Sequence, residues 1–267
     1  MSRDDLAKLE RYIANLGRVA VAYSGGVDST FLLATCARVL GNEHVLALTI
    51  QSPLIPPWEL EFAVGFCRDT GLQHRVLNGS CVFEDERVIS NPMERCYYCK
   101  KRLLDVMQTV IPDTTPLLTA TNASDESDFR PGMRAEAELG IKTPLRELGF
   151  SKHMIRKYSE MDAIPGFDRP SGACFATRIP YGDPISVEKV RMIEQAETFV
   201  RNLGLEVVRV RLLSRDVACI EVGEQEIEKC LEFREQIVGR LADLGFRRVT
   251  LDLEGYRSGK LHCSIGK

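Results

Sequence analysis

Residues 18–40 read RVAVAYSGGVDSTFLLATCARVL and join an apolar strand, a glycine turn and an amphipathic helix in direct succession. The run Arg18–Tyr23 predicts a buried strand, and apolar side chains recur at helical spacing over Ser29–Leu40. Between them, Gly25 and Gly26 allow a backbone with positive φ whose N–H groups approach a ligand closely. The N-terminus of the following helix favours an anion. The stretch therefore predicts a strand–loop–helix unit that binds phosphate.

The sequence on the C-terminal side of this unit continues to alternate between strand and helix patterns. Such alternation is typical of an α/β domain with a parallel twisted sheet and helices on both of its faces. We predict this domain over residues 1–166. Within it we expect strands over 45–50, 74–77 and 117–120, and helices over 58–70, 100–110 and 152–161.

The rest of the chain predicts a linker and a second, smaller domain. Residues 167–184 are rich in proline, glycine and small side chains and contain a cysteine, as expected for a linker that carries chemistry. Residues 185–267 predict an α+β domain. Its expected elements are a helix after Ser186 to Leu203, strands over 206–213 and 218–222, a helix over 224–244 and a strand over 247–253.

Composition excludes several classes of protein. Of the 267 residues, 44% are hydrophobic and 27% charged, so a normal core can form. The net charge of −3 gives no overall attraction to a polyanion, and we predict no nucleic-acid partner. No apolar run is long enough for a membrane span or a signal peptide, which predicts a cytoplasmic protein without a membrane partner. Nine cysteines then indicate reduced thiols.

The loop SGGVDS resembles the SGGxDS pyrophosphate loop of the ATP-pyrophosphatase (PP-loop) superfamily. The match covers Ser24, Gly25, Gly26, Asp28 and Ser29. This resemblance implies an adenine-nucleotide α-hydrolase-like fold that binds ATP, adenylates a substrate oxygen and releases pyrophosphate. We expect Thr49 to Ser52 to recognise adenine, and Mg²⁺ to neutralise the phosphates with Asp28 as a candidate ligand. A lone glycine pair is also compatible with an ordinary strand-to-helix turn.

Four further strings stand out: TNASD at 121–125, DFRPG at 128–132, PSGACFATRIPYG at 170–182 and LDLEGYR at 251–257. Together they resemble the LarE family of ATP-dependent sulfur transferases. This resemblance implies a homo-oligomer that converts a small-molecule substrate, pyridinium-3,5-biscarboxylic acid mononucleotide, to a thiocarboxylate in nickel-pincer cofactor biosynthesis.

Cys174 is the candidate sulfur donor. An adenylated carboxylate is an activated acyl group, and a thiolate near a cation is well suited to attack it. Small residues surround Cys174 in the sequence, with Arg169 and Arg178 on either side. The family resemblance implies a sacrificial route, in which the Cβ–S bond breaks and leaves dehydroalanine.

Cys96 and Cys99 form a Cys-x-x-Cys step followed by Lys100, Lys101 and Arg102, which we expect to favour thiolates. With Cys174 they supply three thiolates, and the resemblance includes a three-cysteine type of the family that holds a [4Fe–4S] cluster. A zinc site, a redox dithiol and a core pair are the alternatives. Cys36, Cys67, Cys219 and Cys230 lie in apolar patterns and predict core residues.

Charged residues add a second set of candidates. Arg209 and Arg211 alternate on a predicted strand and so face one side, where they can bind a phosphate or carboxylate; a solvent-exposed strand face explains them as well. Their spacing resembles the arginine pair that faces the donor cysteine in the LarE family. The same resemblance implies a cation site that includes Glu126 and Glu197.

Two other functions fit parts of this pattern. A tRNA thiolase of the same superfamily also pairs Cys-x-x-Cys with a third cysteine, but such an enzyme needs a large basic surface that this acidic chain lacks. A non-catalytic nucleotide-binding module would bind ATP without releasing pyrophosphate, and would leave Cys174 without a purpose.

Overall fold

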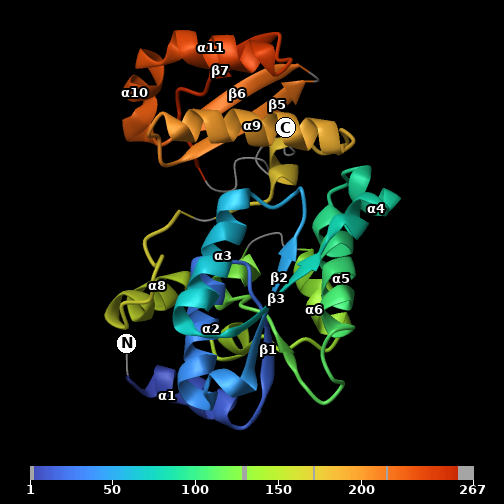
Figure 1. The fold of residues 1–267 in the computed structure, drawn as a ribbon, viewed down its shortest axis with the longest axis vertical. Helices are drawn as coiled ribbons and strands as arrows, with labels where there is room; N and C mark the ends of the chain where they lie inside the picture. The colour runs from blue at the N-terminus through green and yellow to red at the C-terminus, as the bar shows by residue number, and fades with distance from the viewer. Residues whose placement is uncertain (1–2, 128–130, 171, 215, 258–267) are drawn as a thin grey trace. The chain divides into compact units, whose positions relative to one another are not determined.

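The computed structural model describes residues 3–127, 131–170, 172–214 and 216–257, without the side chains of Arg3, Glu126 and Ser127. The chain divides into two compact units, which are described separately (Figure 1). Unit 1 contains the residues up to 88 together with 94–172. Unit 2 contains residues 89–93 and those from 173 onward.

Unit 1 is built on a sheet of four parallel strands in the order β3-β2-β1-β4. The strands are β1 (Val19–Ala22), β2 (Val45–Gln51), β3 (Gln73–Asn78) and β4 (Leu117–Leu118). Its helices are α1 (Arg3–Ala14), α2 (Val27–Leu40), α3 (Pro57–Thr70), α4 (Glu86–Ile89), α5 (Arg95–Gln108), α6 (Gly132–Glu138), α7 (Pro144–Glu147) and α8 (Lys152–Met161). The predicted α/β class is therefore confirmed.

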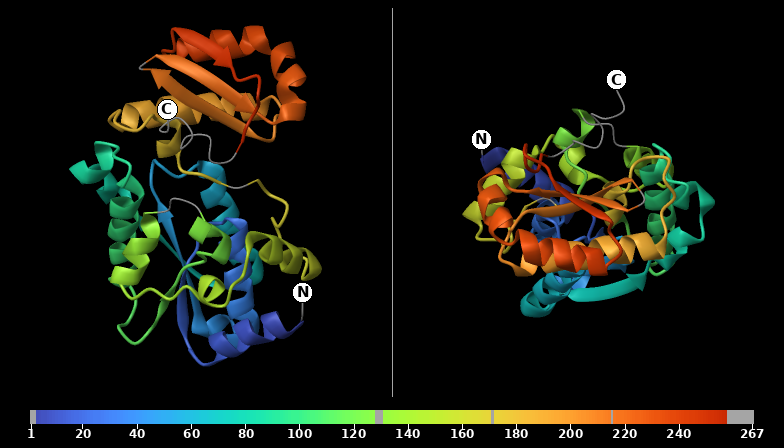
Figure 2. Two further views of the ribbon diagram at one scale, coloured as in Figure 1. Left: turned by 180° about the vertical axis from the view of Figure 1, so that it is seen from behind. Right: turned by 90° about the horizontal axis from the view of Figure 1, so that it is seen from above.

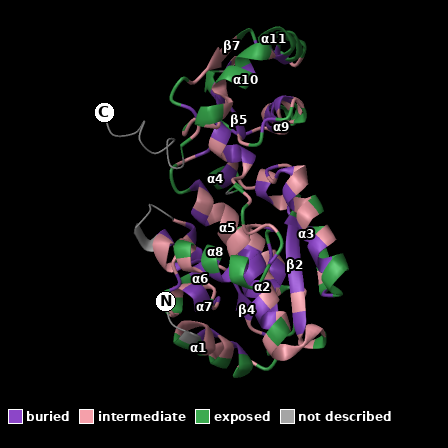
Figure 3. Cartoon of the chain, turned by 90° about the vertical axis from the view of Figure 1, so that its left-hand side faces the viewer, coloured by how far each residue is buried: buried purple, intermediate pink, exposed green. Residues whose placement is uncertain are grey.

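Helices cover both faces of this sheet. Successive strand residues point to opposite faces, so each face contributes side chains to a core of its own. Val19 and Val21 of β1 pack into a core with side chains of α1, α2, α3 and α8. Ala20, between them, packs into a second core with side chains of β2 and α5. Figures 1 and 2 show α5 and α2 on opposite sides of the sheet, and Figure 3 shows that β2 is mostly buried.

Unit 2 combines a three-stranded mixed sheet with helices. Strand β5 (Val208–Ser214) pairs antiparallel with β6 (Val217–Val222), which pairs parallel with β7 (Arg248–Leu251). The helices are α9 (Val187–Asn202), α10 (Ile227–Glu232) and α11 (Arg234–Asp243), and a 3₁₀ turn spans Phe175–Arg178. The buried Asn91 joins residues 89–93 to this unit, since its side-chain amide donates to the carbonyl oxygens of Pro180 (2.7 Å) and Asp183 (2.9 Å).

Strands β4 and β5 differ from their predicted bounds by one or two residues at an end, and two predicted helices differ by more. Helix α5 begins at Arg95 and not at Lys100, so the Cys-x-x-Cys step lies in its first turns. The single helix expected over 224–244 is divided into α10 and α11 at Phe233.

The four cysteines expected in the core are buried, which confirms that prediction: Cys36, Cys67, Cys219 and Cys230. Among the described helices, none is both long and apolar enough to span a bilayer.

Candidate active site

The loop of residues 24–29 joins β1 to α2 in a backbone conformation that requires glycine. Gly25 has a φ of +77°, and a Cβ built on it would lie 2.8 Å from the carbonyl oxygen of Glu59. Gly26 is the N-cap of α2 and has no side chain to bind the first N–H groups of the helix. Backbone donors at the positive end of a 14-residue helix thus face the loop, which is an arrangement that binds phosphate.

Hydroxyl groups hold this loop in shape. Ser29 Oγ lies 3.0 Å from Ser24 Oγ and donates to the carbonyl oxygen of Gly26 at 3.0 Å. Thr30 Oγ1 donates to the same carbonyl at 2.9 Å. Because these bonds come from residues within the loop and α2, the phosphate-binding shape is formed by local sequence.

Asp28 lies in the first turn of α2, beside the segment that follows β4. The amide Nδ2 of Asn122 donates to Asp28 Oδ2 at 2.8 Å. Burial raises the pKa of Asp28 above its ordinary value, and the charge of Asp125 raises it further. A carboxylate that is costly to ionise, next to an anion-binding loop, fits a hard cation such as Mg²⁺, which would remove that cost.

The TNASD segment is fixed to the start of α8. Ser124 Oγ accepts a 3.1 Å hydrogen bond from the backbone N–H of Lys152, and the Lys152 ammonium lies 3.1 Å from Asp125 Oδ1. Ser151 caps α8 by accepting from the N–H of Met154. These contacts hold Asn122 in its place against Asp28. The DFR part of the next motif, residues 128–130, lies outside the described residues.

Thr49 and Ser52, expected near adenine, are both buried. Thr49 Oγ1 donates to the carbonyl oxygen of Tyr23 at 2.8 Å, so its oxygen accepts from His74 Nε2, which lies 2.8 Å away. Burial lowers the pKa of His74, in keeping with a neutral ring. Ser52 Oγ accepts from the N–H of Leu54. Adenine recognition by Thr49 and Ser52 stays a prediction.

Cys96 and Cys99 lie one helical turn apart in α5, and both are half-buried. Cys96 Sγ accepts from the guanidinium of Arg95 at 3.6 Å. The predicted cations behave differently: the Lys100 ammonium lies 2.7 Å from the buried Glu136, and Lys101 pairs with Glu138. The cation beside the sulfur is therefore Arg95, which sequence reasoning missed because it precedes the motif.

Cys174 lies in unit 2, at the N-cap of the 3₁₀ turn. The buried Arg178 donates from Nη1 to the carbonyl oxygens of Ala173 (2.9 Å) and Cys174 (3.2 Å). Its Nε and Nη2 bind both carboxylate oxygens of Glu197, at 2.7 and 3.0 Å. Glu197 Oε1 also accepts from the N–H of Val210. The cysteine thus sits on a turn that a buried ion pair anchors to α9 and β5.

The two arginines of β5 lie close to this turn. Arg211 Nη1 donates to the carbonyl oxygen of Thr177 at 2.7 Å, and its Nε pairs with the buried Glu221. The Arg209 guanidinium lies 4.9 Å from the centre of the Tyr256 ring, and burial lowers its pKa, as does the charge of Arg178. Three guanidinium groups therefore lie near the cysteine turn, and two of them, those of Arg178 and Arg211, are paired with buried glutamates.

The predicted cation ligands are distributed differently. Both oxygens of Glu197 accept hydrogen bonds, and the side chain of Glu126 lies outside the described residues. Within the described part of the chain, no three His, Cys, Asp or Glu side chains form a group suited to a metal ion. A cation role for Glu126 and Glu197 stays a prediction.

Residues 165–170 and 172, here called the strap, precede Cys174 in the chain. Arg169 Nη1 donates to the carbonyl oxygen of Gly25 at 3.0 Å, and its Nη2 lies 3.2 Å from Glu59 Oε2. Sequence analysis named Arg169 only for its distance in sequence from Cys174, and missed Glu59 altogether. Neither Glu59 nor the preceding prolines carry a motif that could have indicated this contact.

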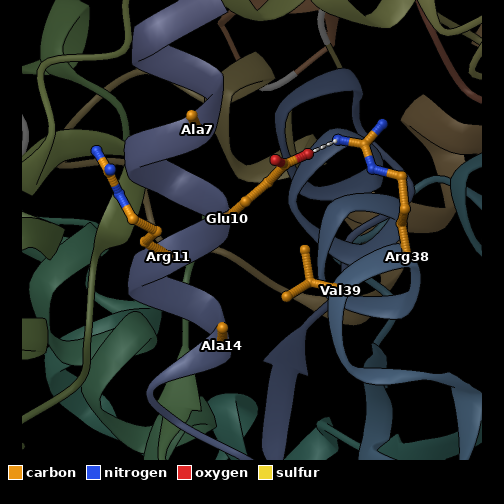
Figure 4. A pocket seen from close by; sticks show the side chains of 6 residues that line it. All are labelled: Ala7, Glu10, Arg11, Ala14, Arg38 and Val39. Atoms are coloured by element: carbon orange, nitrogen blue, oxygen red, sulfur yellow. Dashed lines mark hydrogen bonds and ion pairs between the residues drawn. The ribbon is translucent and has the colours of Figure 1, made fainter.

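A hollow of about 440 Å³ lies elsewhere in unit 1, between α1 and α2. Figure 4 shows it beside the ion pair of Glu10 with Arg38, whose atoms are 3.0 Å apart. Arg38 is at the C-terminal end of α2, whereas the loop of residues 24–29 is at its N-terminal end. This hollow is therefore separate from the candidate active site.

Comparison with known proteins finds relatives that match the chain over its whole length. It is 36% identical over 271 residues to an uncharacterized protein of Synechocystis sp., with both chains fully covered. It is 31% identical over 265 residues to the pyridinium-3,5-bisthiocarboxylic acid mononucleotide synthase of Lactiplantibacillus plantarum, covering 98% of this chain and 95% of the relative.

A shorter match links the chain to other ATP-using enzymes. The NH₃-dependent NAD⁺ synthetase of Methanoregula boonei is 30% identical over 93 residues, which is 35% of this chain and 38% of that protein. No family model matches the chain.

Proposed function

Because this chain belongs to the LarE family of ATP-dependent sulfur transferases, we propose that it converts a carboxylate of pyridinium-3,5-biscarboxylic acid mononucleotide into a thiocarboxylate. The observation that carries the proposal is the 31% identity to a synthase of the bisthiocarboxylic acid mononucleotide over 98% of the chain. The formed PP-loop and the anchored Cys174 turn support it.

The first step is adenylation of the substrate. The N–H groups of loop 24–29 bind the phosphates of ATP, and Asp28 would hold a Mg²⁺ ion, which would supply positive charge to neutralise them. A carboxylate oxygen of the substrate attacks the α-phosphorus, the bond to the β-phosphate oxygen breaks, and pyrophosphate leaves. The product is an acyl adenylate, in which AMP is a good leaving group.

The second step moves sulfur. The Cys174 thiolate attacks the acyl carbon, AMP leaves and a thioester forms. A base then removes the Cα proton of Cys174, the Cβ–S bond breaks, and the electron pair stays on sulfur. The products are the substrate thiocarboxylate and a dehydroalanine at position 174, so the protein loses the atoms of one H₂S. The positive charges of Arg209 and Arg211 suit an anionic substrate at this turn.

The strap supports delivery of this thiol to the adenylate. Its residue Gly172 lies against Glu59, because a Cβ built on Gly172 would be 2.8 Å from Glu59 Oε1. The Glu59 carbonyl in turn lies against Gly25 of the loop. Cys174 follows Gly172 by two residues, and two residues of extended chain reach at most about 7 Å. The thiol is thus tethered by a short chain to residues that pack on the nucleotide loop.

A [4Fe–4S] cluster is the alternative source of sulfur. Cys96 and Cys99 fit two ligands of such a cluster, since their thiols are half-buried and one helical turn apart, with Arg95 beside Cys96. Cys174 would be the third. When bound with three protein ligands, a cluster offers one iron that can hold an exogenous sulfide, which would spare Cys174.

The experiment incubates the protein with ATP, Mg²⁺ and the pyridinium substrate, and follows both small molecules and intact protein by mass spectrometry. We expect thiocarboxylate, AMP and pyrophosphate, with one H₂S lost from the chain for each sulfur transferred. Cys174→Ala should still release pyrophosphate but form no thiocarboxylate. Cys81→Ala, at another half-buried free cysteine, is the matched control and should behave as wild type. Thiocarboxylate formed by Cys174→Ala would exclude the proposed role of this thiol.

A further inference from the structure

Arg169 holds the strap against the nucleotide loop at two points. One nitrogen of its guanidinium donates to the Gly25 carbonyl oxygen at 3.0 Å, and another lies 3.2 Å from the Glu59 carboxylate. The guanidinium carbon also lies 4.0 Å from the centre of the Phe62 ring, a cation–π contact. A single side chain therefore connects the strap to the loop and to α3.

The strap is fixed from its other side by α8. Arg156 donates to the carbonyl oxygens of Phe167 (2.8 Å) and Arg169 (3.1 Å). Gly166 has a φ of +80°, and a Cβ on it would lie 2.7 Å from Phe62 Cζ. These contacts fix the shape of the strap around Gly166, Phe167 and Arg169.

Glu59 contacts both the nucleotide loop, at Gly25, and the strap, at Gly172. It is only 8% exposed, its carbonyl oxygen lies against Gly25, and its carboxylate lies against Gly172. The same carboxylate pairs with Arg169. A change in the balance of charge around Arg169 therefore reaches Gly172, two residues before the donor cysteine.

A phosphate bound to loop 24–29 would change the contacts of Arg169 for a geometric reason. The carbonyl of Gly25 and the N–H of Gly26 belong to one planar peptide unit, so turning the N–H toward an anion turns the carbonyl as well. A bound triphosphate also attracts the neighbouring guanidinium directly. Both effects weaken the bond from Arg169 to Gly25 and shift the guanidinium relative to Glu59.

We propose that Arg169, together with Glu59, is a positioning residue that couples ATP binding in loop 24–29 to the position of Cys174. This rests on the proposed function, because it assigns the coupling to the thiol that donates sulfur. By linkage, whatever ATP does to the Cys174 segment, that segment does in equal measure to the affinity for ATP. The Cys174 thiol then takes its reactive position when ATP is bound.

The test measures the alkylation rate of Cys174 by peptide-resolved mass spectrometry, with and without saturating Mg·ATP and without the pyridinium substrate. In wild type we expect ATP to change this rate by about fivefold or more. Arg169→Met keeps the aliphatic stem and removes the charge; at ATP concentrations shown by titration to saturate the variant, it should lose the response. Arg68→Met, at an exposed arginine of α3 paired with Asp69, is the control and should respond as wild type.

Two further measurements separate coupling from simple loss of structure. Glu59→Gln keeps the size and an acceptor oxygen, so it should fold and show a reduced response. In Arg169→Met at saturating ATP, thiocarboxylate formation should fall by a larger factor than pyrophosphate release, whereas general unfolding would lower both by the same factor. A wild-type Cys174 rate that ignores bound ATP, or an unchanged response in both variants, overturns the coupling. Absence of ATP binding in wild type would instead overturn the proposed function.

Discussion

The side-chain amide of Asn122 donates a 2.8 Å hydrogen bond to the carboxylate of Asp28, linking the segment after β4 to the first turn of α2. Burial and the charge of Asp125 raise the pKa of Asp28, and they outweigh the opposite effects of this hydrogen bond and of Lys152 and Arg156. Ionising Asp28 therefore costs stability in the protein without ligand, and the Mg²⁺ ion proposed above would remove that cost.

Asp28→Asn should accordingly stabilise the ligand-free protein at neutral pH. The folded-state pKa of Asp28 is raised, so ionising it as pH rises destabilises the fold, and Asn removes that loss. Thermal melts should show a higher Tm for the variant at pH 7. The difference should shrink as pH falls through the pKa of Asp28, where the wild-type carboxyl is also neutral.

The same variant should lose activity. A metal contact supplies several kcal/mol, so Mg²⁺-dependent pyrophosphate release should fall by about tenfold or more. Equal Tm values at pH 7, or full activity, would contradict the role given to Asp28.

Gly25→Ala should abolish ATP binding, because it adds a steric clash to the backbone strain. The positive φ costs about 1–2 kcal/mol for a residue with a Cβ, and the new methyl also meets the Glu59 carbonyl at 2.8 Å. Gly149→Ala is a matched control, because its φ is +76° with nothing within 4 Å. Isothermal calorimetry should detect no ATP binding for the first and normal binding for the second. Similar affinities in both variants would argue against a loop whose shape depends on Gly25.

Arg178→Met should destabilise unit 2 by about 3–5 kcal/mol, since it leaves the carboxylate of Glu197 buried without its cation. Both side chains are at most 1% exposed. Arg234→Met removes an ion pair with Glu235 in which both side chains are more than 70% exposed, and it should cost less than about 1 kcal/mol. The hydrogen exchange of the β5 amides, measured at increasing urea concentration, would give the loss of stability in both variants. A loss below about 1 kcal/mol for Arg178→Met would contradict the anchoring role.

Cys96→Ala should decide between the two sources of sulfur. If Cys96 and Cys99 hold a cluster with Cys174, protein purified without oxygen is brown and contains iron and sulfide, and this variant loses both. Cys81→Ala should keep them. Colourless, iron-free wild-type protein that loses one H₂S after turnover would assign the sulfur to Cys174 alone.

The sequence predicted those elements of the fold whose pattern lies within a short stretch of chain. The β1–loop–α2 unit follows from an apolar run, two glycines and helical spacing within 23 residues, and the structure has it within two residues at each boundary. The start of α5 was missed because the Cys-Tyr-Tyr-Cys step has weak helix formers and no capping side chain. Its first turns are stabilised instead by tertiary contacts, such as Arg134 stacked 3.6 Å from the Tyr97 ring centre.

The sequence predicted the motif residues of the candidate site but not the long-range hydrogen bonds that join them. Cysteines, glycines and Asp28 carry chemistry that residue type and spacing reveal. The contacts of Asn122 with Asp28 and of Arg169 with Gly25 join residues 94 and 144 positions apart, so they exist only once the sheet has brought distant segments together. Nothing in the sequence near Phe233 marks the division between α10 and α11.

The turn that carries Cys174 is gripped by its backbone carbonyls, and the sulfur takes no part in the bonds from Arg178. On the sacrificial route, a spent molecule would therefore keep the same anchors as a fresh one. Chaperones and proteases that recognise misfolding would find no difference between them. The yield of product would then be set by how many copies of the chain the ribosome makes, and not by how fast each one works.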